Sequence, residues 1–564
     1  MIRPGIGGKS KRIYKSRAEC SQFDCAARPL FSLREPRRVK KVAESFPLFL
    51  YWRAGCDILN GNHRDSAARG IRGHRTVQVM LYDVLIIGAG CTGVMTARLL
   101  SMKNVKVAVA EARCDVAMGA TCANSAIVHA GYDAKPGTLK AKLNVRGNTL
   151  MKALGAQLGV EVKNVGSHVV GFGEEDLPKL KELYERGIAN GVPGLEIIGQ
   201  DALRRMEPRI SEEATHSLWA PSAAITCPYG ITIAAAENAV TNGVDFYFNF
   251  KVSASVRDGE GFAVSDGEKT IRARYVVNCA GVHSAELAGI LGERDFPITI
   301  TPRRGEYYIL DKNAGHLANS TLFVCPSDRG KGILVSPTVD GNLIVGPNAY
   351  PIEDGDDRAT TAAGLAEITA GAKRIMPTVP MNMAITSFAG VRATPNIYDF
   401  YLKRSEQVPG LIHAVGVESP GFASSPATAE YLVGLLEEAG LKLTDKESYI
   451  PTRRPDGNHI QFNRLSEEEK AELCRKNPAY GKIVCRCETV TEGDLLDMLD
   501  APIPAVTIDM MKKRLRAGMG RCQGGFCSPR VAALIAERTG MGLENVTKHG
   551  GGSWLVTKRT DGEE

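Results

Sequence analysis

Three neighbouring stretches follow one another in the order strand, helix, strand. Residues 82–87 form an apolar run, a glycine-rich turn follows, and residues 92–102 repeat apolar side chains at helical spacing. A second apolar run, residues 105–110, ends at Glu111. Short apolar runs bounded by glycine turns are typical of buried parallel strands. The pattern therefore predicts a βαβ unit.

Strand and helix patterns continue through the middle of the chain. Residues 139–160 carry leucines at helical spacing, which predicts a long helix. The clearest hairpin joins residues 262–264 to residues 271–273 through the turn Asp266-Gly267. Further strands are expected at residues 275–278, 306–310, 332–335, 343–345 and 411–415.

The residue composition changes twice in the last part of the chain. A glycine- and serine-rich turn leads into a predicted helix over residues 426–439. Residues 451–466 are rich in Pro, Asn and Arg, which is the composition of a linker. A charged helix over residues 467–476 then opens a separate C-terminal module. A length of 564 residues fits two to four domains.

Positive charge is concentrated at the start of the chain. The net charge is +7, but residues 1–80 carry 17 Lys and Arg against 6 Asp and Glu. The remaining residues therefore carry a net charge of −4, and we expect no nucleic-acid binding. Because residues 1–79 lack periodicity and end at Met80, we interpret them as upstream sequence translated from a wrongly assigned start. A targeting peptide, which the acids and cysteines fit poorly, and a functional tail are the alternatives.

Hydropathy and cysteine content indicate the cellular compartment in which the protein is expected to work. No apolar run approaches the roughly 20 residues of a membrane-spanning helix, so we expect no direct membrane insertion. The chain has 14 cysteines but is too large for a small disulfide-held domain, and clustered cysteines then indicate metal ligands in a reducing compartment. We expect a cytoplasmic protein, for which peripheral association with a membrane through a partner stays open.

The first turn has the spacing Gly88-x-Gly90-x-x-Gly93. Gly88 permits a tight turn, Gly90 lets the backbone approach a pyrophosphate, and Gly93 allows close packing of helix and strand. Glu111 ends the second strand, where a carboxylate binds ribose hydroxyls and repels the 2′-phosphate of NADP. The pattern predicts a site for FAD or NAD. FAD is favoured because no second glycine triplet offers an NADH domain.

Segments across about residues 82–440 resemble FAD-dependent oxidoreductases of the D-amino-acid oxidase and glycerol-3-phosphate dehydrogenase type. The matching segments are DVLIIGAGCTGVMTARLL, SAIVHAGYDAKPGTLKAKL, VVNCAGVHS, PRRGEYYIL, SPTVDGNLIVGP, FAGVRATPN and VGVESPGFASSPATAEYL. The segment HAGYDAKPG is also similar to L-2-hydroxyglutarate oxidases. The resemblance implies an α/β fold in which a Rossmann-type domain binds FAD and an interleaved, mixed-sheet domain binds substrate.

Three side chains are candidates for the chemistry of such an enzyme. Oxidation of an alcohol by a flavin requires a base for the hydroxyl proton, and His129 lies in a segment that approaches the flavin in the family. Arg392 is expected to bind a substrate phosphate or carboxylate, with Arg304 as a weaker second contact. The alternatives are a structural histidine and arginines held in ordinary ion pairs.

Further cofactor contacts are implied by the resemblance. The turn and helix start that contain Gly421, Ser424 and Ser425 lie against the flavin in the family, where amide dipoles stabilise the reduced ring. Ala280 and Gly281, after the strand at residues 275–278, are predicted to contact the same cofactor. Plain capping of the helix is the alternative for the serines.

Four cysteines near the C-terminus have the spacing C-x-C-x34-C-x4-C, namely Cys485, Cys487, Cys522 and Cys527. Four thiolates can hold a [2Fe–2S] cluster, and zinc is the nearest competitor, although zinc sites favour C-x2-C pairs. The surrounding segments resemble bacterioferritin-associated-ferredoxin-like domains, and the resemblance implies that all four bind a [2Fe–2S] cluster. A relic without a cluster is the third reading.

These observations predict an FAD-dependent dehydrogenase with its own electron relay. We expect it to oxidise a small anionic alcohol, first glycerol 3-phosphate, and to pass electrons through the cluster to a one-electron acceptor protein or a quinone-linked partner. The alternatives are a 2-hydroxy acid such as L-2-hydroxyglutarate, an amine or amino-acid oxidase subunit, and a non-catalytic redox subunit. The expected boundaries are residues 1–79 for the leader, 80–450 for the oxidoreductase, 451–466 for the linker, 467–550 for the iron–sulfur domain and 551–564 for a tail.

Overall fold

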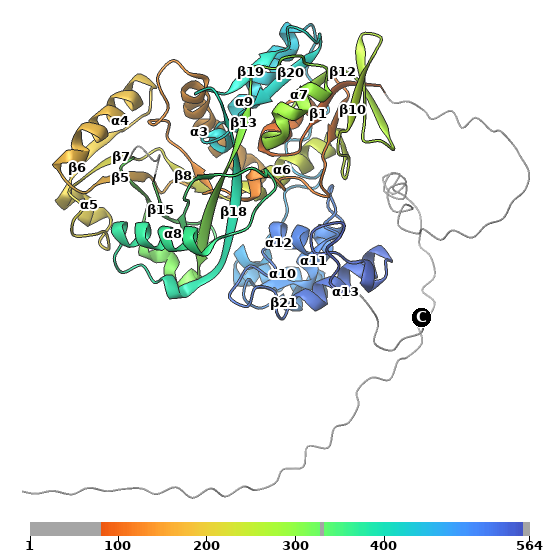
Figure 1. The fold of residues 1–564 in the computed structure, drawn as a ribbon. Helices are drawn as coiled ribbons and strands as arrows, with labels where there is room; N and C mark the ends of the chain where they lie inside the picture. Colours follow the sequence, from red (N-terminus) through yellow and green to blue (C-terminus); the bar gives the residue numbers. More distant parts are fainter. Residues whose placement is uncertain (1–80, 327–331, 557–564) are drawn as a thin grey trace, which may run out of the picture. The chain divides into compact units, whose positions relative to one another are not determined.

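The computed structural model describes residues 81–326 and 332–556, which lie in one compact unit (Figure 1). The predicted leader at residues 1–79 and the end of the predicted tail lie outside the described residues. Within the described part of the chain, no helix is both long and apolar enough to cross a membrane.

The predicted βαβ unit is present. It consists of β1 (Leu81–Ile87), α2 (Cys91–Ser101) and β2 (Val107–Ala110), and β1 pairs in parallel with β2. All four residues of β2 are buried, as are the last four of β1. Burial on both faces explains why these strands read as continuous apolar runs and not as alternating ones.

The first sheet has eight strands and contains β1 near its centre. Its order is β10-β11-β12-β1-β2-β9, and β20 pairs with both β12 and β19. The predicted hairpin is confirmed, because β11 and β12 are antiparallel with Phe262 opposite Ala273. The bounds are β9 (Asp245–Tyr247), β10 (Ala254–Asp258), β11 (Gly261–Ser265), β12 (Thr270–Asn278), β19 (Tyr401–Arg404) and β20 (Leu411–Val415).

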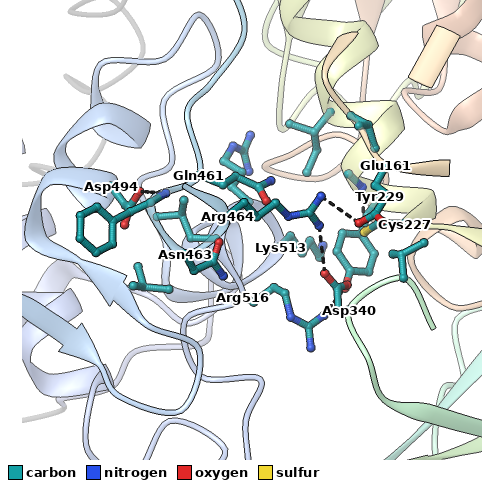
Figure 2. A pocket seen from close by; sticks show the side chains of 18 of the residues that line it. Glu161, Cys227, Tyr229, Asp340, Gln461, Asn463, Arg464, Asp494, Lys513 and Arg516 are labelled. Atoms are coloured by element: carbon teal, nitrogen blue, oxygen red, sulfur yellow. Dashed lines mark hydrogen bonds and ion pairs between the residues drawn. The ribbon is translucent and has the colours of Figure 1, made fainter. Parts of the chain in front are cut away.

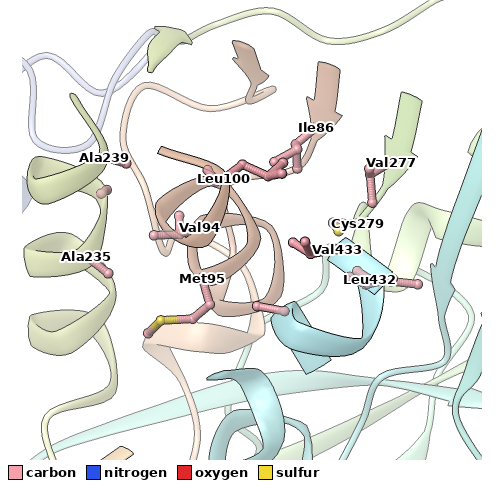
Figure 3. Packing of buried hydrophobic residues seen from close by; sticks show 14 of the residues in the cluster. Ile86, Val94, Met95, Leu100, Ala235, Ala239, Val277, Cys279, Leu432 and Val433 are labelled. Carbon is pink, nitrogen blue, oxygen red and sulfur yellow. The ribbon is translucent and has the colours of Figure 1, made fainter. Parts of the chain in front are cut away.

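Helices pack beside this sheet and bury its largest apolar cluster. Helix α2 packs against α6 (Pro228–Thr241) and α9 (Gly421–Glu438), and α3 (Leu139–Leu158) packs against α9. Figure 3 shows the buried side chains that fill this region, among them Ile86, Val94, Met95, Leu100, Ala235, Ala239, Val277, Leu432 and Val433. The predicted helix over residues 139–160 is thus confirmed as α3.

Helix α9 begins earlier than predicted, at Gly421 instead of Pro426. A proline inside a helix has no N–H for the carbonyl four residues before it, which here belongs to Phe422. The hydroxyl of Ser425 donates to that carbonyl at 2.8 Å and satisfies it. The helix therefore extends through the proline.

The second sheet has nine strands and is mixed. Its order is β17-β13-β16-β15-β14-β5-β7-β6, with β18 paired to β13, and only the β14–β5 pair is parallel. The strands are β5 (Ser167–Gly171), β6 (Glu196–Gly199), β7 (His216–Ala220), β13 (Ile300–Leu310), β14 (Thr321–Val324), β15 (Leu334–Pro337), β16 (Leu343–Gly346), β17 (Tyr350–Pro351) and β18 (Ala384–Pro395). Its helices are α4 (Leu177–Ala189), α5 (Gln200–Met206) and α8 (Ala362–Ile375).

The two sheets are built from alternating parts of the chain, so the domains interleave as expected. A small three-stranded sheet consists of β3 (Ile127–Val128), β8 (Ala224–Thr226) and β4 (Val162–Lys163). The helix α7 (Ser284–Ile290) follows β12. Short 3-10 helices lie at Ala120–Cys122, Glu174–Asp176, Gly281–His283, Lys312–Leu317, Met381–Met383, Phe462–Arg464, Pro478–Gly481 and Leu543–Asn545.

The C-terminal module is helical and has a core of its own. The charged helix α10 has the bounds that the sequence predicts, and a capping box of Ser466 and Glu469 fixes its start. The buried core includes Leu495, Met511 and Ile535. The elements are α10 (Glu467–Lys476), β21 (Ile483–Cys485), β22 (Val490–Thr491), α11 (Glu492–Leu499), α12 (Ile508–Leu515) and α13 (Ser528–Thr539).

The stretch predicted as a linker is packed against the oxidoreductase part. Arg453 forms a buried ion pair with Glu237 of α6 at 2.7 Å. The amide of Asn238, also on α6, donates to the carbonyls of Ile450 and Thr452. Composition predicted a linker, and the start of this stretch is held by buried contacts to α6.

Candidate functional site

A large cavity of about 1340 Å³ lies where the two sheets meet. It is lined by the glycine turn after β1, by the ends of β2 and β12, by the start of α9, and by β13 and β18. A cavity between two domains, with polar groups from several strand ends, is the usual setting of a cofactor and substrate site. The lining includes the predicted residues Gly88, Gly90, Glu111, His129, Ala280, Gly281, Arg392 and Gly421.

The glycine turn needs glycine at two positions for steric reasons. Gly88 has a φ of +108°, and a Cβ there would lie 2.4 Å from the carbonyl oxygen of Cys279. A Cβ on Gly93 would lie 2.0 Å from the carbonyl oxygen of Gly88, because helix and turn are in direct contact. Gly90 lies at the cavity wall, directly before α2. The N–H groups of α2 thus open toward the cavity, as a bound pyrophosphate requires.

Glu111 follows β2 and lines the cavity. Its carboxylate accepts the N–H groups of Ala89 at 2.7 Å and Arg113 at 2.9 Å. Burial raises the pKa of this carboxyl group, and the two backbone donors oppose that shift. A carboxylate held in this way at the end of the second strand has the position that binds the ribose of a dinucleotide.

His129 lies directly after β3 and lines the cavity. Its carbonyl accepts the side-chain amides of Asn144 at 2.8 Å and Asn148 at 3.1 Å, both from α3. Its ring stacks on Phe323, with ring centres 5.9 Å apart. The backbone and the ring of His129 are therefore held by two different elements, which suits a group that must meet a substrate in one orientation.

Two arginines lie on the same face of neighbouring strands at the cavity. Arg303 of β13 is the register partner of Arg392 of β18, and both line the cavity. Gly305 lies two residues after Arg303, on the same face of β13. A Cβ on Gly305 would lie 2.9 Å from the guanidinium of Arg392, so glycine leaves room for that side chain. Within the described residues, neither arginine has an ion pair or hydrogen bond to a carboxylate. Guanidinium groups are donors that can bind a phosphate or carboxylate in a bidentate way.

The structure places Arg304, the second predicted arginine, outside the cavity lining. Successive strand residues point to opposite faces, so Arg304 faces away from Arg303. Its guanidinium pairs with Asp357 and lies 3.7 Å from Glu306. Strand alternation could have identified Arg303 instead, because it shares a face with Tyr307, another cavity residue.

The start of α9 contributes its backbone to the cavity, but its two serines do not contribute side chains. Gly421 lines the cavity, whereas Ser424 and Ser425 are fully buried. The Ser424 hydroxyl donates to the carbonyl of Pro420 at 3.1 Å. The Ser425 hydroxyl donates to the carbonyl of Phe422, which Pro426 leaves without an N–H donor. Both hydroxyls thus support the helix start, and the helix dipole is what reaches the cavity.

The four C-terminal cysteines come together from two loops. The sulfur atoms of Cys487 and Cys522 are 3.7 Å apart. Cys485, at the end of β21, has a hydrogen bond with Cys527, which lowers the pKa of the Cys485 thiol. Four thiols in two adjacent pairs fit a binuclear cluster, whose two irons each bind two cysteines. Across the described ranges, no group of three or more His, Cys, Asp or Glu side chains is placed to hold a single metal ion.

Backbone N–H groups surround these sulfur atoms. Cys485 accepts N–H groups that include that of Gly518, and Cys522 accepts those of Gly524 and Phe526. A Cβ on Gly520 would lie 2.3 Å from the Cβ of Cys487, so glycine is required there. Hydrogen bonds to thiolate sulfurs stabilise their charge and tune a cluster's potential.

Ion pairs hold the cysteine module against the oxidoreductase part. Arg516 donates to Glu488, the residue after Cys487, and to Asp340 of the second sheet. A small cavity of about 80 Å³ lies at this contact. In Figure 2, Arg464 lies between Glu161 and Asp340 and pairs with both carboxylates. The cysteine loops are therefore fixed to the domain that contains Arg303 and Arg392.

A second contact joins the module to the loop after β2. Both carboxylate oxygens of Asp115 accept the guanidinium of Arg514 at 2.9 Å, and both side chains are buried. We expect Arg514→Met to weaken the docking of the module by about 3–5 kcal/mol, because Asp115 would be left buried and unpaired. Hydrogen exchange of α12 and α13 measures this loss.

The matched control is the double variant Asp115→Asn with Arg514→Met, which removes the stranded charge. It is expected to recover part of the protection against exchange. Equal exchange in the single variant and the unsubstituted protein would show that the ion pair does not hold the module.

The fold and the two sites define a class of protein. Residues 83–435 match the family model described as FAD dependent oxidoreductase, and residues 483–537 match the BFD-like [2Fe-2S] binding domain. The chain belongs to the FAD dependent oxidoreductase family, and its cofactors are FAD and a [2Fe–2S] cluster. The predicted fold class, enzyme class and cofactors are confirmed.

The chain is similar to several individual proteins of this family. A glycerol 3-phosphate dehydrogenase of Caloramator mitchellensis is 43% identical over 483 residues, which are 86% of this chain and 100% of that protein. A glycerol 3-phosphate oxidase of Mycoplasma genitalium is 31% identical, over 65% of this chain and 97% of its own. The solved structure of dithionite-reduced L-alpha-glycerophosphate oxidase from Mycoplasma pneumoniae with FAD bound is 29% identical, with a TM-score of 0.63 over 66% of this chain and 98% of that one.

Proposed function

We propose that this protein is a glycerol-3-phosphate dehydrogenase that passes electrons through its cluster to an external acceptor. The observation that carries the proposal is the pair Arg303 and Arg392, which are register partners of β13 and β18 and both line the cavity. A phosphate dianion has three oxygens to share between two guanidinium groups, which match its geometry and charge. The similarity to glycerol 3-phosphate dehydrogenase supports the same substrate.

The residues have separate tasks in this proposal. Arg303 and Arg392 bind the phosphate and place the secondary alcohol beside His129, which takes the hydroxyl proton as the carbon–hydrogen bond breaks. Bound FAD supplies the acceptor for the hydride, and the cluster supplies a one-electron exit. The glycine turn and Glu111 hold the nucleotide end, and Ala280, Gly281 and Gly421 line the wall toward the ring.

The cluster and the free thiols indicate the cellular compartment of the protein. The eleven described cysteines are free thiols in the structure, and four of them form the cluster site. A labile cluster next to free thiols fits the reducing cytoplasm. We place the protein there, with a one-electron carrier protein or a quinone-linked partner as its acceptor.

His129→Asn is expected to slow substrate-driven flavin reduction by roughly 100- to 10,000-fold, because the proton acceptor is lost. The variant is also expected to lose the rise in rate with pH that a base produces. Anaerobic stopped-flow measurement of flavin bleaching at several pH values tests both. His316→Gln is the control, since His316 does not line the cavity. A His129 variant that keeps the normal pH profile would exclude His129 as the base.

The substrate is tested by anaerobic bleaching with a panel. We expect glycerol 3-phosphate to bleach the flavin fastest, with glycerol, L-2-hydroxyglutarate and amino acids far slower. Faster bleaching by L-2-hydroxyglutarate or an amino acid would replace the proposed substrate. Bleaching by none, with normal reduction by dithionite, would favour a non-catalytic redox subunit.

A further inference from the structure

One apolar side chain beside the cluster site is exposed to solvent. Phe526 has a relative exposure of 89%, the highest among the exposed large hydrophobic residues in the described ranges. It lies directly before Cys527, and its N–H bonds the sulfur of Cys522. An exposed phenyl ring adds little to the packing of the module, and its burial against a partner would contribute hydrophobic free energy to association.

The cluster site opens toward solvent on one side. Cys485 and Cys527 are buried in the core of the module, whereas Cys487 is exposed and Cys522 is partly exposed. The pair Cys487 and Cys522 therefore marks the edge where a partner could come closest to the irons. Phe526 belongs to this edge through its contact with Cys522.

Exposed charge in the two cysteine loops is positive. Arg486, between Cys485 and Cys487, is exposed. Lys482 and Arg530, on either side of these loops in the sequence, share one carboxylate, that of Glu492. Glu488, directly after Cys487, is buried and bound to Lys312 and Arg516, and Asp311 is bound to Arg521, directly before Cys522.

We propose that Phe526, Arg486, Lys482 and Arg530 form the docking surface for a small acidic one-electron carrier protein. We call these four residues the exit surface, and the proposal rests on the proposed exit of electrons through the cluster. Redox encounters use small interfaces, in which one buried aromatic anchor supplies much of the affinity. Basic side chains around the anchor attract an acidic carrier and raise its rate of association.

The test uses the intact protein, reduced beforehand with a titrated amount of dithionite, so that no alcohol substrate is involved. A small acidic Rieske-type [2Fe–2S] ferredoxin serves as the probe, because its potential is higher than that of plant-type ferredoxins and lets it accept the electrons. Stopped-flow absorbance follows its reduction. Phe526→Ser is expected to lower the second-order rate constant about tenfold. Arg486→Glu is expected to lower it about tenfold at low salt and to flatten its salt dependence.

Two matched controls lie far from the cysteines in sequence. Val256→Ser removes an apolar side chain that is 64% exposed, and Lys269→Glu reverses an exposed charge in the hairpin turn. Both are expected to leave ferredoxin reduction unchanged. Ferricyanide reduction and the EPR signal of the reduced cluster should be the same in all variants.

Several outcomes would overturn the proposal. An unchanged ferredoxin rate in Phe526→Ser would do so, and so would an equal loss with ferricyanide, which would locate the effect in the cluster. A loss confined to quinone-containing lipid vesicles would assign the surface to a membrane. A loss of dimers in Phe526→Ser would assign it to a second copy of the chain. Failure of glycerol 3-phosphate to bleach the flavin would refute the proposed substrate alone.

Discussion

Arg392→Met is expected to lower kcat/KM for glycerol 3-phosphate by roughly 100-fold or more. Truncating one partner of a desolvated charge pair costs about 2–5 kcal/mol, and each 1.4 kcal/mol is about tenfold. Arg303→Met should have a similar effect if both arginines bind the same phosphate, as we propose from their paired register in the cavity wall. In the double variant, the fold decrease in kcat/KM should be smaller than the product of the fold decreases in the two single variants. Steady-state kinetics with an artificial acceptor measure all three.

Three further arginine variants make this result specific. Arg392→Lys keeps the charge but not the fork of donors, so its loss should be intermediate. Arg404→Met, at the surface of the first sheet, should leave kcat/KM unchanged. Arg304→Met should lower stability through its pair with Asp357 and leave KM close to normal. A KM increase with Arg304→Met that matches the loss in Arg392→Met would assign Arg304 to the phosphate site after all.

Cys487→Ser is expected to remove the cluster while leaving the flavin site intact. Iron should fall from about two atoms per chain to near zero, and the EPR signal of the reduced cluster should disappear. Flavin bleaching by substrate should continue, because the cavity contains no part of this loop. Electron delivery to a one-electron carrier protein should fall by roughly 100-fold or more, since the relay is lost.

Cys487 is the best of the four positions for this experiment because it is exposed and removes little core packing. Cys474→Ser is the matched control, since Cys474 lies on α10 of the same module and outside the cysteine cluster. It should keep its iron and its rate. Full iron content in Cys487→Ser would mean that another residue completes the ligand set.

Local sequence patterns predicted the elements that depend on local chemistry. The βαβ unit, the hairpin and α10 were predictable because strand length, turn glycines and a capping box act over a few residues. The start of α9 was predicted wrongly, because Pro426 signals a helix start. Only the hydroxyl of Ser425 shows that the missing hydrogen bond is replaced.

The candidate site was predictable in kind and less so in detail. His129 and Arg392 were selected by chemistry and resemblance, and the structure brings both to the cavity. Arg304 was selected beside Arg392, whereas the structure brings Arg303 to the cavity wall, and the alternation of β13 could have separated the two. The serines of α9 were expected at the cofactor, but their hydroxyls bind the helix backbone.

The sequence by itself determined the class of the protein, because the glycine spacing and the four cysteines are local patterns with demanding chemistry. Only the tertiary structure decided which side chains work together. Arg303 and Arg392 are neighbours through the antiparallel register of β13 and β18, and Asp115 meets Arg514 across the module contact. Such pairings depend on strand register and domain docking, which sum many weak contacts along the whole chain.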